Sequence, residues 1–276
     1  MTADAELPAY EPLLDAYHRA FAAELAAMVG SLPVAPGGSV LELACGDGAY
    51  TPWLADRVGP SGTVVGLDVS DAYLRVAQRG ARRGRAASRA RFVAASVDRL
   101  PFADGAFDLA WCAQSFFSLP DPLHAVRQMA RVVRPGGLVA VLEDDKLHQV
   151  LLPWPVDVEL AVRAAEWRAL RDESKRPVKF YVGRHLVAVF REAGLVDVRA
   201  RTSASNRVAP LDAPTRSFLA SYLAGLRERV VPGLEPAVRA EFEGLVDPGS
   251  PDALLDRPDL ALTVIDHVVH GRKPGE

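Results

Sequence analysis

The chain has 276 residues, of which 49% are hydrophobic, and it carries a formal net charge of −3. This length suffices for one large buried core, so we expect a single enlarged domain. The negative charge argues against nucleic acid as the main partner, because phosphate binding needs a strongly basic surface. Nowhere do about 18 apolar residues follow one another, so the sequence predicts a cytoplasmic protein without membrane spans.

The two cysteines of the chain, Cys45 and Cys112, are too few for a disulfide framework. Neither stands in the Cys-x-x-Cys or Cys/His spacing that holds zinc. We therefore expect both thiols to be reduced and predict no metal site.

Apolar runs bounded by turn residues alternate with stretches of helical periodicity through most of residues 1–200. This alternation predicts a mostly parallel sheet with helices on both faces. The predicted strands span 38–44, 63–68, 91–95, 106–112 and 137–142, and the helices between them span 49–58, 71–81 and 122–133. Ser70 and Asp121 are the expected N-caps, and Gly136 with Gly137 is expected to end the last of these helices.

Further segments flank this core. We expect an amphipathic helix over Glu11 to Met28. After the fifth strand, the predicted helices span 153–174, 183–193, 214–231 and 234–246, and two final strands span 195–202 and 260–270. These last strands are too far apart for a hairpin loop of about 2 to 5 residues, so the gap must hold its own structure.

We therefore expect one domain over residues 1–276. Its core takes in about 30–145, 183–203 and 259–271. Helical insertions over about 148–180 and 204–258 are expected to form a substrate lid, because the sheet is complete without them.

The segment VLELACGDG, residues 40–48, is an apolar strand with one acid inside it, followed by small residues and then a helix. Gly46 and Gly48 let the backbone turn sharply and approach a ligand closely, and the following helix presents free amides. The glycines could also serve only a tight strand-to-helix turn. Glu42 inside the strand points toward a cationic ligand, although backbone amides could also satisfy a buried acid.

The segment VVGLDVS, residues 64–70, places Asp68 at the carboxyl end of the next strand, 20 residues after Gly48. A carboxylate there can accept both hydroxyl hydrogens of a ribose. Taken alone, Asp68 could instead belong to the N-cap region of the following helix. Together with the glycine loop, ribose binding is the favoured interpretation.

A dinucleotide would be the competing cofactor. Its Gly-x-Gly-x-x-Gly fingerprint has Thr51 in place of the third glycine here, and the Gly-Lys-Ser/Thr of a nucleotide triphosphate site is missing. The sequence thus shows no cradle for a pyrophosphate.

Four blocks between about residues 38 and 145 follow one another in a recognisable order. They are VLELACGDG (40–48), GLDVS (66–70), SVDRLPFADGAFDLAWCAQSFFSLPDP (96–122) and ARVVRPGGLVAV (130–141). With these blocks the chain resembles the class I S-adenosylmethionine-dependent methyltransferase family. The resemblance implies a Rossmann-like α/β fold: a seven-stranded, mostly parallel sheet with helices on both faces, an N-terminal helix and helical lid insertions. It also implies S-adenosylmethionine as the cofactor.

The resemblance implies a role for each matching position. The residues that would line the methionine part of the cofactor are Glu42, Ala44, Cys45, Gly46 and Gly48. Asp68 would hold the ribose, and Val69 would pack on the adenine.

The remaining cofactor positions follow the third and fourth strands. Val97 and Asp98 would approach the adenine edge, and Gln114 would close the cofactor side at the end of the fourth strand. Two positions depart from the family pattern. Ala44 stands where glycine is commoner, and Ser96 stands where many relatives have an aspartate that meets the adenine amino group.

Methyl transfer from a sulfonium requires alignment of the nucleophile with the methyl carbon, and a hydroxyl or acidic carbon also needs a general base. Our candidate base is His148, which follows the acidic residues 143–145 just beyond the fifth strand, where open parallel sheets place their ligands. His185 and, on the N-terminal helix, Tyr17 and His18 are further candidates.

We expect methyl transfer to a small organic molecule, preferably at oxygen in specialised metabolism, with C- or N-methylation as close alternatives. Two other interpretations stay open: a cyclase-like enzyme that binds S-adenosylmethionine without transferring its methyl group, and a catalytically silent binding module. Trp154, Trp167 and Tyr181 are expected to wall an apolar substrate pocket or to pack in the core. A small-molecule substrate is the expected partner, and homodimerisation is left open.

Overall fold

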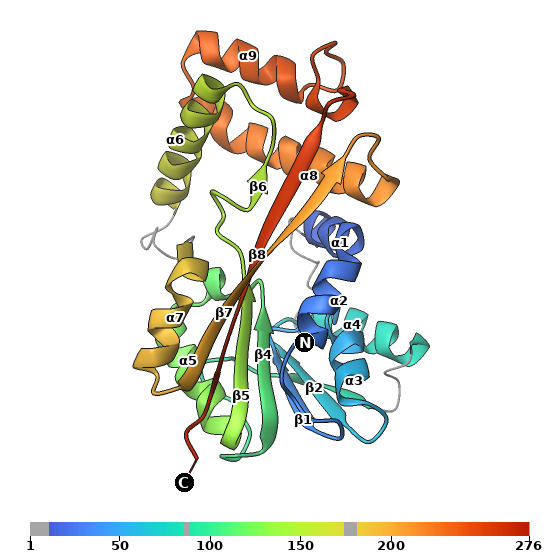
Figure 1. The fold of residues 1–276 in the computed structure, drawn as a ribbon, viewed down its shortest axis with the longest axis vertical. Helices are drawn as coiled ribbons and strands as arrows, with labels where there is room; N and C mark the ends of the chain where they lie inside the picture. The colour runs from blue at the N-terminus through green and yellow to red at the C-terminus, as the bar shows by residue number, and fades with distance from the viewer. Residues whose placement is uncertain (1–10, 85–88, 174–180, 276) are drawn as a thin grey trace.

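The computed structural model describes residues 11–84, 89–173 and 181–275, and Figure 1 shows a twisted sheet with helices against both faces, below a further group of helices. The strands are β1 (Ser39–Leu43), β2 (Thr63–Asp68), β3 (Ala90–Ala94), β4 (Phe107–Ala113), β5 (Val133–Glu143), β6 (Val150–Leu151), β7 (Val196–Val208) and β8 (Ala261–Arg272). Their order is β3-β2-β1-β4-β5-β8-β6, and β7 also pairs with β8. Strands β1 to β5 are parallel, and β8 is antiparallel to β5. The predicted α/β sheet is confirmed, and the two-residue β6 adds an eighth strand to the predicted seven.

The helices are α1 (Glu11–Ala20), α2 (Ala22–Gly30), α3 (Thr51–Val58), α4 (Asp71–Arg83), α5 (Pro122–Val132), α6 (Val156–Glu173), α7 (Val182–Glu192), α8 (Ala213–Val230) and α9 (Pro236–Val246). Both predicted N-caps are confirmed. The side chain of Ser70 accepts a hydrogen bond from the amide of Tyr73, and that of Asp121 accepts one from the amide of His124.

Two predictions about where helices end are wrong, and the strand predicted over 195–202 runs on to Val208. The helix predicted over Glu11 to Met28 breaks at Phe21, whose buried ring meets Phe218 of α8 edge to face at a centroid distance of 5.4 Å. Gly136 and Gly137 do not end α5 but lie inside β5. A Cβ on Gly137 would lie 3.0 Å from the carbonyl oxygen of Asp108, so close packing of backbones requires glycine there.

Side chains of β5 alternate between two buried clusters, one on each face of the sheet. Leu138, Ala140 and Leu142 belong to the cluster that includes α2 and α3, while Val139 and Val141 belong to the cluster with α5 and α7. Because helices cover both faces, a ligand reaches the sheet at the carboxyl ends of its parallel strands.

Helices α6, α8 and α9, which we call the lid, lie beyond those carboxyl ends (Figure 1). Helices α8 and α9 stand in the chain between β7 and β8, two long strands that run from the core to the lid. Arg229 of α8 lies 3.3 Å from the buried Glu166 of α6, and Trp154 stacks on Phe242 of α9 at 5.8 Å. Trp154 therefore packs in the core of the lid.

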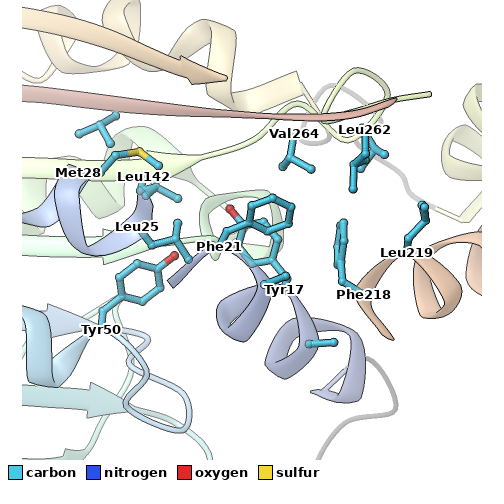
Figure 2. Close-up of a cluster of buried hydrophobic side chains, with 14 of the residues drawn as sticks. Tyr17, Phe21, Leu25, Met28, Tyr50, Leu142, Phe218, Leu219, Leu262 and Val264 are labelled. Atoms are coloured by element: carbon cyan, nitrogen blue, oxygen red, sulfur yellow. The ribbon is translucent and has the colours of Figure 1, made fainter. Parts of the chain in front are cut away.

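Helix α1 lies between the sheet and the lid. Figure 2 shows Tyr17 and Phe21 beside Val264 of β8 and Phe218 of α8, in one buried cluster. The rings of Tyr17 and Phe218 are 5.7 Å apart. Across the described ranges, no helix combines the length and apolarity that crossing a membrane requires.

Candidate active site

A left-handed turn follows β1 where the chain leaves the sheet. The φ angles of Ala44, Gly46 and Gly48 are 48°, 54° and 80°, in the region that glycine adopts without strain. A Cβ on Gly48 would lie 3.1 Å from the Cβ of Ala77 in α4, whereas no atom lies within 4 Å of a Cβ built on Gly46. Gly48 thus lets the loop pack on α4, and Gly46 leaves its side of the loop open to a ligand.

Asp68 ends β2 beside this loop. Its carboxylate accepts hydrogen bonds from the amides of Gly46 at 3.0 Å and Ser70 at 2.8 Å. These bonds fix the carboxylate and leave further lone pairs for the hydroxyl groups of a ligand. The neighbouring Val69 is 73% exposed, so an uncovered apolar side chain stands next to the carboxylate, where a flat base can pack.

The turn after β3 lies beside Asp68, whose carbonyl oxygen accepts a hydrogen bond from the amide of Ala95 at 3.0 Å. The hydroxyl of Ser96 donates to the carboxylate of Asp98 at 3.2 Å and accepts from the Asp98 amide at 3.1 Å. Val97 is buried, so its side chain anchors this turn in the core. The structure thus brings the predicted ribose and adenine residues to one edge of the sheet.

Gln114 follows β4 with a φ of 51°, a backbone conformation that is uncommon outside glycine and clusters at functional sites. Its amide donates to the carbonyl of Leu142 in β5 at 2.8 Å. Its side-chain oxygen Oε1 accepts from the hydroxyl of Tyr50 at 3.2 Å and lies 2.9 Å from Nε2 of His18. Gln114 therefore joins the end of β4 to both the glycine loop and α1.

Glu42 and Cys45 have buried side chains beneath the loop. The hydroxyl of Thr51 donates to Glu42 at 2.5 Å, and burial raises the pKa of the Glu42 carboxyl to about 8. The Cys45 sulfur lies 3.0 Å from the place where a Cβ on Gly66 would stand, which directs it toward β2. The two side chains support the loop from below.

Three further acids, Glu143, Asp144 and Asp266, are buried where β5 and β8 lie side by side. Glu143 pairs in register with His267, so Asp266 lies next to Asp144 just beyond that pair. The hydroxyl of Tyr17 on α1 donates to Oδ1 of Asp266 at 2.6 Å. Among the described residues, Oδ2 of Asp266 and Oδ1 of Asp144 are buried without a hydrogen-bond partner.

Burial changes the protonation of Asp266 and Glu143. It raises the pKa of Asp266 to about 7, although the hydrogen bond from Tyr17 acts in the opposite direction. Burial and the charge of Asp144 raise the pKa of Glu143 to about 8. This edge of the sheet therefore holds groups that can exchange protons near neutral pH.

The structure places His148 farther out, with 56% of its side chain exposed. Its Nδ1 lies 3.6 Å from Asp145 and 3.2 Å from a guanidinium nitrogen of Arg184. A guanidinium only donates, so Nδ1 accepts and a neutral His148 keeps its hydrogen on Nε2. The ring of Tyr181 lies 6.4 Å from His148 and 5.5 Å from Trp167.

The glycine loop, Asp68 with Val69, and Gln114 form one site at the carboxyl ends of β1, β2 and β4. The open side of Gly46 fits a short polar tail, the Asp68 carboxylate fits a ribose, and Val69 fits a flat base. The fold and the site suit an α/β enzyme that binds a nucleoside-containing cofactor at the carboxyl ends of its strands.

Comparison with known proteins leads to the same class. The sequence profile of the methyltransferase domain matches residues 41–141. The chain is 28% identical over 247 residues to 27-O-demethylrifamycin SV methyltransferase of Amycolatopsis mediterranei. This match covers 90% of this chain and 81% of that protein. It is 30% identical over 180 residues to demethylmenaquinone methyltransferase of a Geobacillus species, covering 61% of this chain and 75% of that one. The solved structure of the [4+2]-cyclase SpnF aligns with a TM-score of 0.52 at 20% identity, covering 92% of this chain and 82% of SpnF.

The chain belongs to the class I S-adenosylmethionine-dependent methyltransferase family. It is a methyltransferase, and its cofactor is S-adenosylmethionine.

Asp266 was missed by sequence reasoning. It interrupts the apolar alternation of TVIDHVV, residues 263–269, on the face shared with Val264 and Val268, and this interruption was the available signal. No local sequence pattern predicts the contact between His18 and Gln114, because the two residues are 96 positions apart.

Proposed function

We propose that this methyltransferase transfers the methyl group to a hydroxyl oxygen of a small organic molecule in specialised metabolism. The relative from Amycolatopsis mediterranei supports this proposal, because its name describes methylation of a hydroxyl oxygen on such a compound and the similarity spans 90% of this chain. That similarity includes the lid segments and not only the cofactor core.

The observation that carries the choice of oxygen is the buried carboxylate oxygen Oδ1 of Asp144, which has no hydrogen-bond partner among the described residues. Buried acceptors need donors, since an unpaired one costs about 1 to 3 kcal/mol. A substrate hydroxyl can supply such a donor, whereas an acidic carbon cannot. An amine can also donate, so N-methylation is the competing outcome.

We propose that the cofactor lies along the carboxyl edge of the sheet. The proposed contacts are Glu42, Ala44, Cys45, Gly46, Gly48, Asp68, Val69, Ser96, Val97, Asp98 and Gln114. The loop would hold the methionine part and Asp68 would orient the ribose, while α1 and the lid would exclude water from the reacting atoms. The half-buried rings of Trp167 and Tyr181 would wall the acceptor pocket.

An acceptor screen tests the proposal. Purified protein and S-adenosylmethionine are incubated with hydroxyl, amine and acidic-carbon acceptors, among them 27-O-demethylrifamycin SV and a demethylmenaquinol. Mass spectrometry follows S-adenosylhomocysteine and the methylated product. We expect a methoxy product. An N-methyl or C-methyl product alone, or an isomerised acceptor without S-adenosylhomocysteine, would overturn the assignment to oxygen.

His148 stays a prediction as the general base. Its exposed position at the rim, next to Asp145 and Arg184, would suit contact with an acceptor that enters beneath the lid.

A further inference from the structure

His18 lies on α1 where the glycine loop and the end of β4 come together. Its Nε2 is 2.9 Å from Oε1 of Gln114, and its ring meets that of Tyr50 edge to face at 5.2 Å. Both neighbours border the cofactor site described above. Of the histidines considered as bases, His18 is the one that contacts a proposed cofactor residue.

These contacts fix the tautomer of His18. A side-chain amide oxygen only accepts, so Nε2 carries the hydrogen and donates it to Gln114. The hydroxyl of Tyr50 donates to the same oxygen at 3.2 Å, which supports this orientation of the Gln114 amide. The neutral ring then keeps its free lone pair on Nδ1. This atom is buried and has no hydrogen-bond partner in the described part of the chain.

Burial also keeps the ring neutral. Desolvation lowers the pKa of His18, and this effect outweighs the hydrogen bond to Gln114 and the charges of Asp47 and Asp15, which raise it. A neutral imidazole with one nitrogen held and the other free can accept a proton.

We propose that His18 is the catalytic residue that takes the proton from the acceptor hydroxyl, and that Gln114 is the positioning residue that holds its ring. The inference rests on the proposed transfer to oxygen. The acceptor oxygen forms its new bond to the methyl carbon while the carbon–sulfur bond breaks and its electron pair stays on sulfur. The hydroxyl proton passes to Nδ1 of His18, and the resulting imidazolium later releases a proton to solvent.

His148 differs from His18 in both respects that matter here. It is more than half exposed, and its Nδ1 is taken by Arg184, so its remaining nitrogen carries the hydrogen. The arrangement seen in the structure therefore favours His18, and the kinetic experiment includes both residues.

The first test does not depend on turnover. Nitrogen-15 NMR of the full chain bound to S-adenosylhomocysteine, with the signal assigned by His18→Gln, reports which ring nitrogen carries hydrogen. We expect a neutral ring with hydrogen on Nε2 at neutral pH. An imidazolium, or a hydrogen on Nδ1, would overturn the proposal.

The second test compares His18→Gln with Arg19→Gln, a change at the exposed neighbour on the same helix. The glutamine amide at position 18 can still donate to Gln114, but its carbonyl oxygen is far too weak a base to take a proton in place of Nδ1. With the hydroxyl acceptor from the screen, we expect kcat to fall at least about 100-fold in His18→Gln. The Kd for S-adenosylmethionine should stay unchanged, and Arg19→Gln should keep full activity.

An acceptor whose hydroxyl is already ionised at neutral pH needs no base, so His18→Gln should methylate it at nearly the wild-type rate. Three results would contradict the role of His18. They are an equal loss of kcat on both acceptors in His18→Gln, a loss of cofactor affinity as large as the loss of kcat, or a larger loss of kcat in His148→Gln. Wild-type protein that methylates only nitrogen or carbon would instead sink the proposed function, so the two failures can be told apart.

Discussion

The hydroxyl of Tyr17 donates a hydrogen bond of 2.6 Å to Asp266, although 249 residues separate the two in the chain. The bond fastens α1 to β8 at the edge where the acceptor is expected. Both side chains are buried, so water cannot replace either partner.

Tyr17→Phe should lower the free energy of unfolding by about 1 to 3 kcal/mol, because Asp266 would lose its only hydrogen-bond donor among the described residues. Urea denaturation followed by circular dichroism measures the change. Asp266→Asn and the double variant complete a thermodynamic cycle. Strictly additive losses would show that the two side chains do not stabilise one another.

Between about pH 6.5 and 8 the free energy of unfolding should fall. Burial raises the pKa of Asp266 to about 7 and those of Glu42 and Glu143 to about 8. In the unfolded chain these carboxyls titrate near about 4. The folded protein therefore holds protons that the unfolded chain has released. This contribution is fully present below the unfolded values and is lost as pH rises through the folded ones.

Each retained proton corresponds to a slope of at most about 1.4 kcal/mol per pH unit. The partly buried His18 acts in the opposite direction because desolvation lowers its pKa, but only below the ordinary histidine range. Urea midpoints across this pH interval measure the slope, and Asp266→Asn should flatten part of it. A free energy of unfolding that rises with pH here would contradict the prediction.

Asp68→Ala should weaken the binding of S-adenosylmethionine at least about tenfold, or about 1.4 kcal/mol, because the ribose hydroxyls lose their acceptor. Calorimetry measures the Kd. Asp71→Ala, at the exposed start of α4, is the matched control and should leave the Kd unchanged. Since Asp68 also accepts from two amides, a thermal melt must show that the variant is folded. Unchanged affinity in a folded Asp68→Ala would remove Asp68 from the cofactor site.

Alanine variants of Gly46, Gly48 and Gly59, which all have positive φ, can distinguish an effect of backbone strain from an effect of cofactor contact. Gly46→Ala and Gly59→Ala each place a side chain on a backbone with positive φ, at a cost of about 1 to 3 kcal/mol, and no atom lies within 4 Å of either new Cβ. Only the methyl group at position 46 would face the proposed cofactor, so only Gly46→Ala should weaken S-adenosylmethionine binding. Gly48→Ala should chiefly lower stability, because its Cβ would lie 3.1 Å from that of Ala77. Equal affinities for the Gly46 and Gly59 variants would contradict the placement of the cofactor tail.

The meeting of the glycine loop and Asp68 at one edge of the sheet could be predicted from sequence, because each part is local. Gly46 and Gly48 follow β1 directly, Asp68 ends β2, and consecutive parallel strands end at the same edge of a sheet. Their meeting in space follows from the alternation of strands and helices. The caps at Ser70 and Asp121 were equally local.

The contacts of α1 with Gln114 and Asp266 could not be predicted in this way. The contact between His18 and Gln114 joins residues 96 positions apart, and the chain turns at Phe21 just after His18. Likewise, Asp266 meets Tyr17 only because β8 enters the sheet beside β5. Helical periodicity continues through Phe21 and carries no sign of that turn.

The lid helices α8 and α9 leave and re-enter the sheet at neighbouring points, because Val208 of β7 pairs with Ala261 of β8. A segment whose two ends are held side by side can change in length or sequence without shifting the pairing of the strands beneath it. Apart from its packing on Tyr17 and Phe21 through Phe218, this lid segment can therefore vary without disturbing the strands that we propose to hold the cofactor. A new acceptor preference can therefore arise from changes in α8 and α9, while the sequence of strands β1 to β5 stays the same.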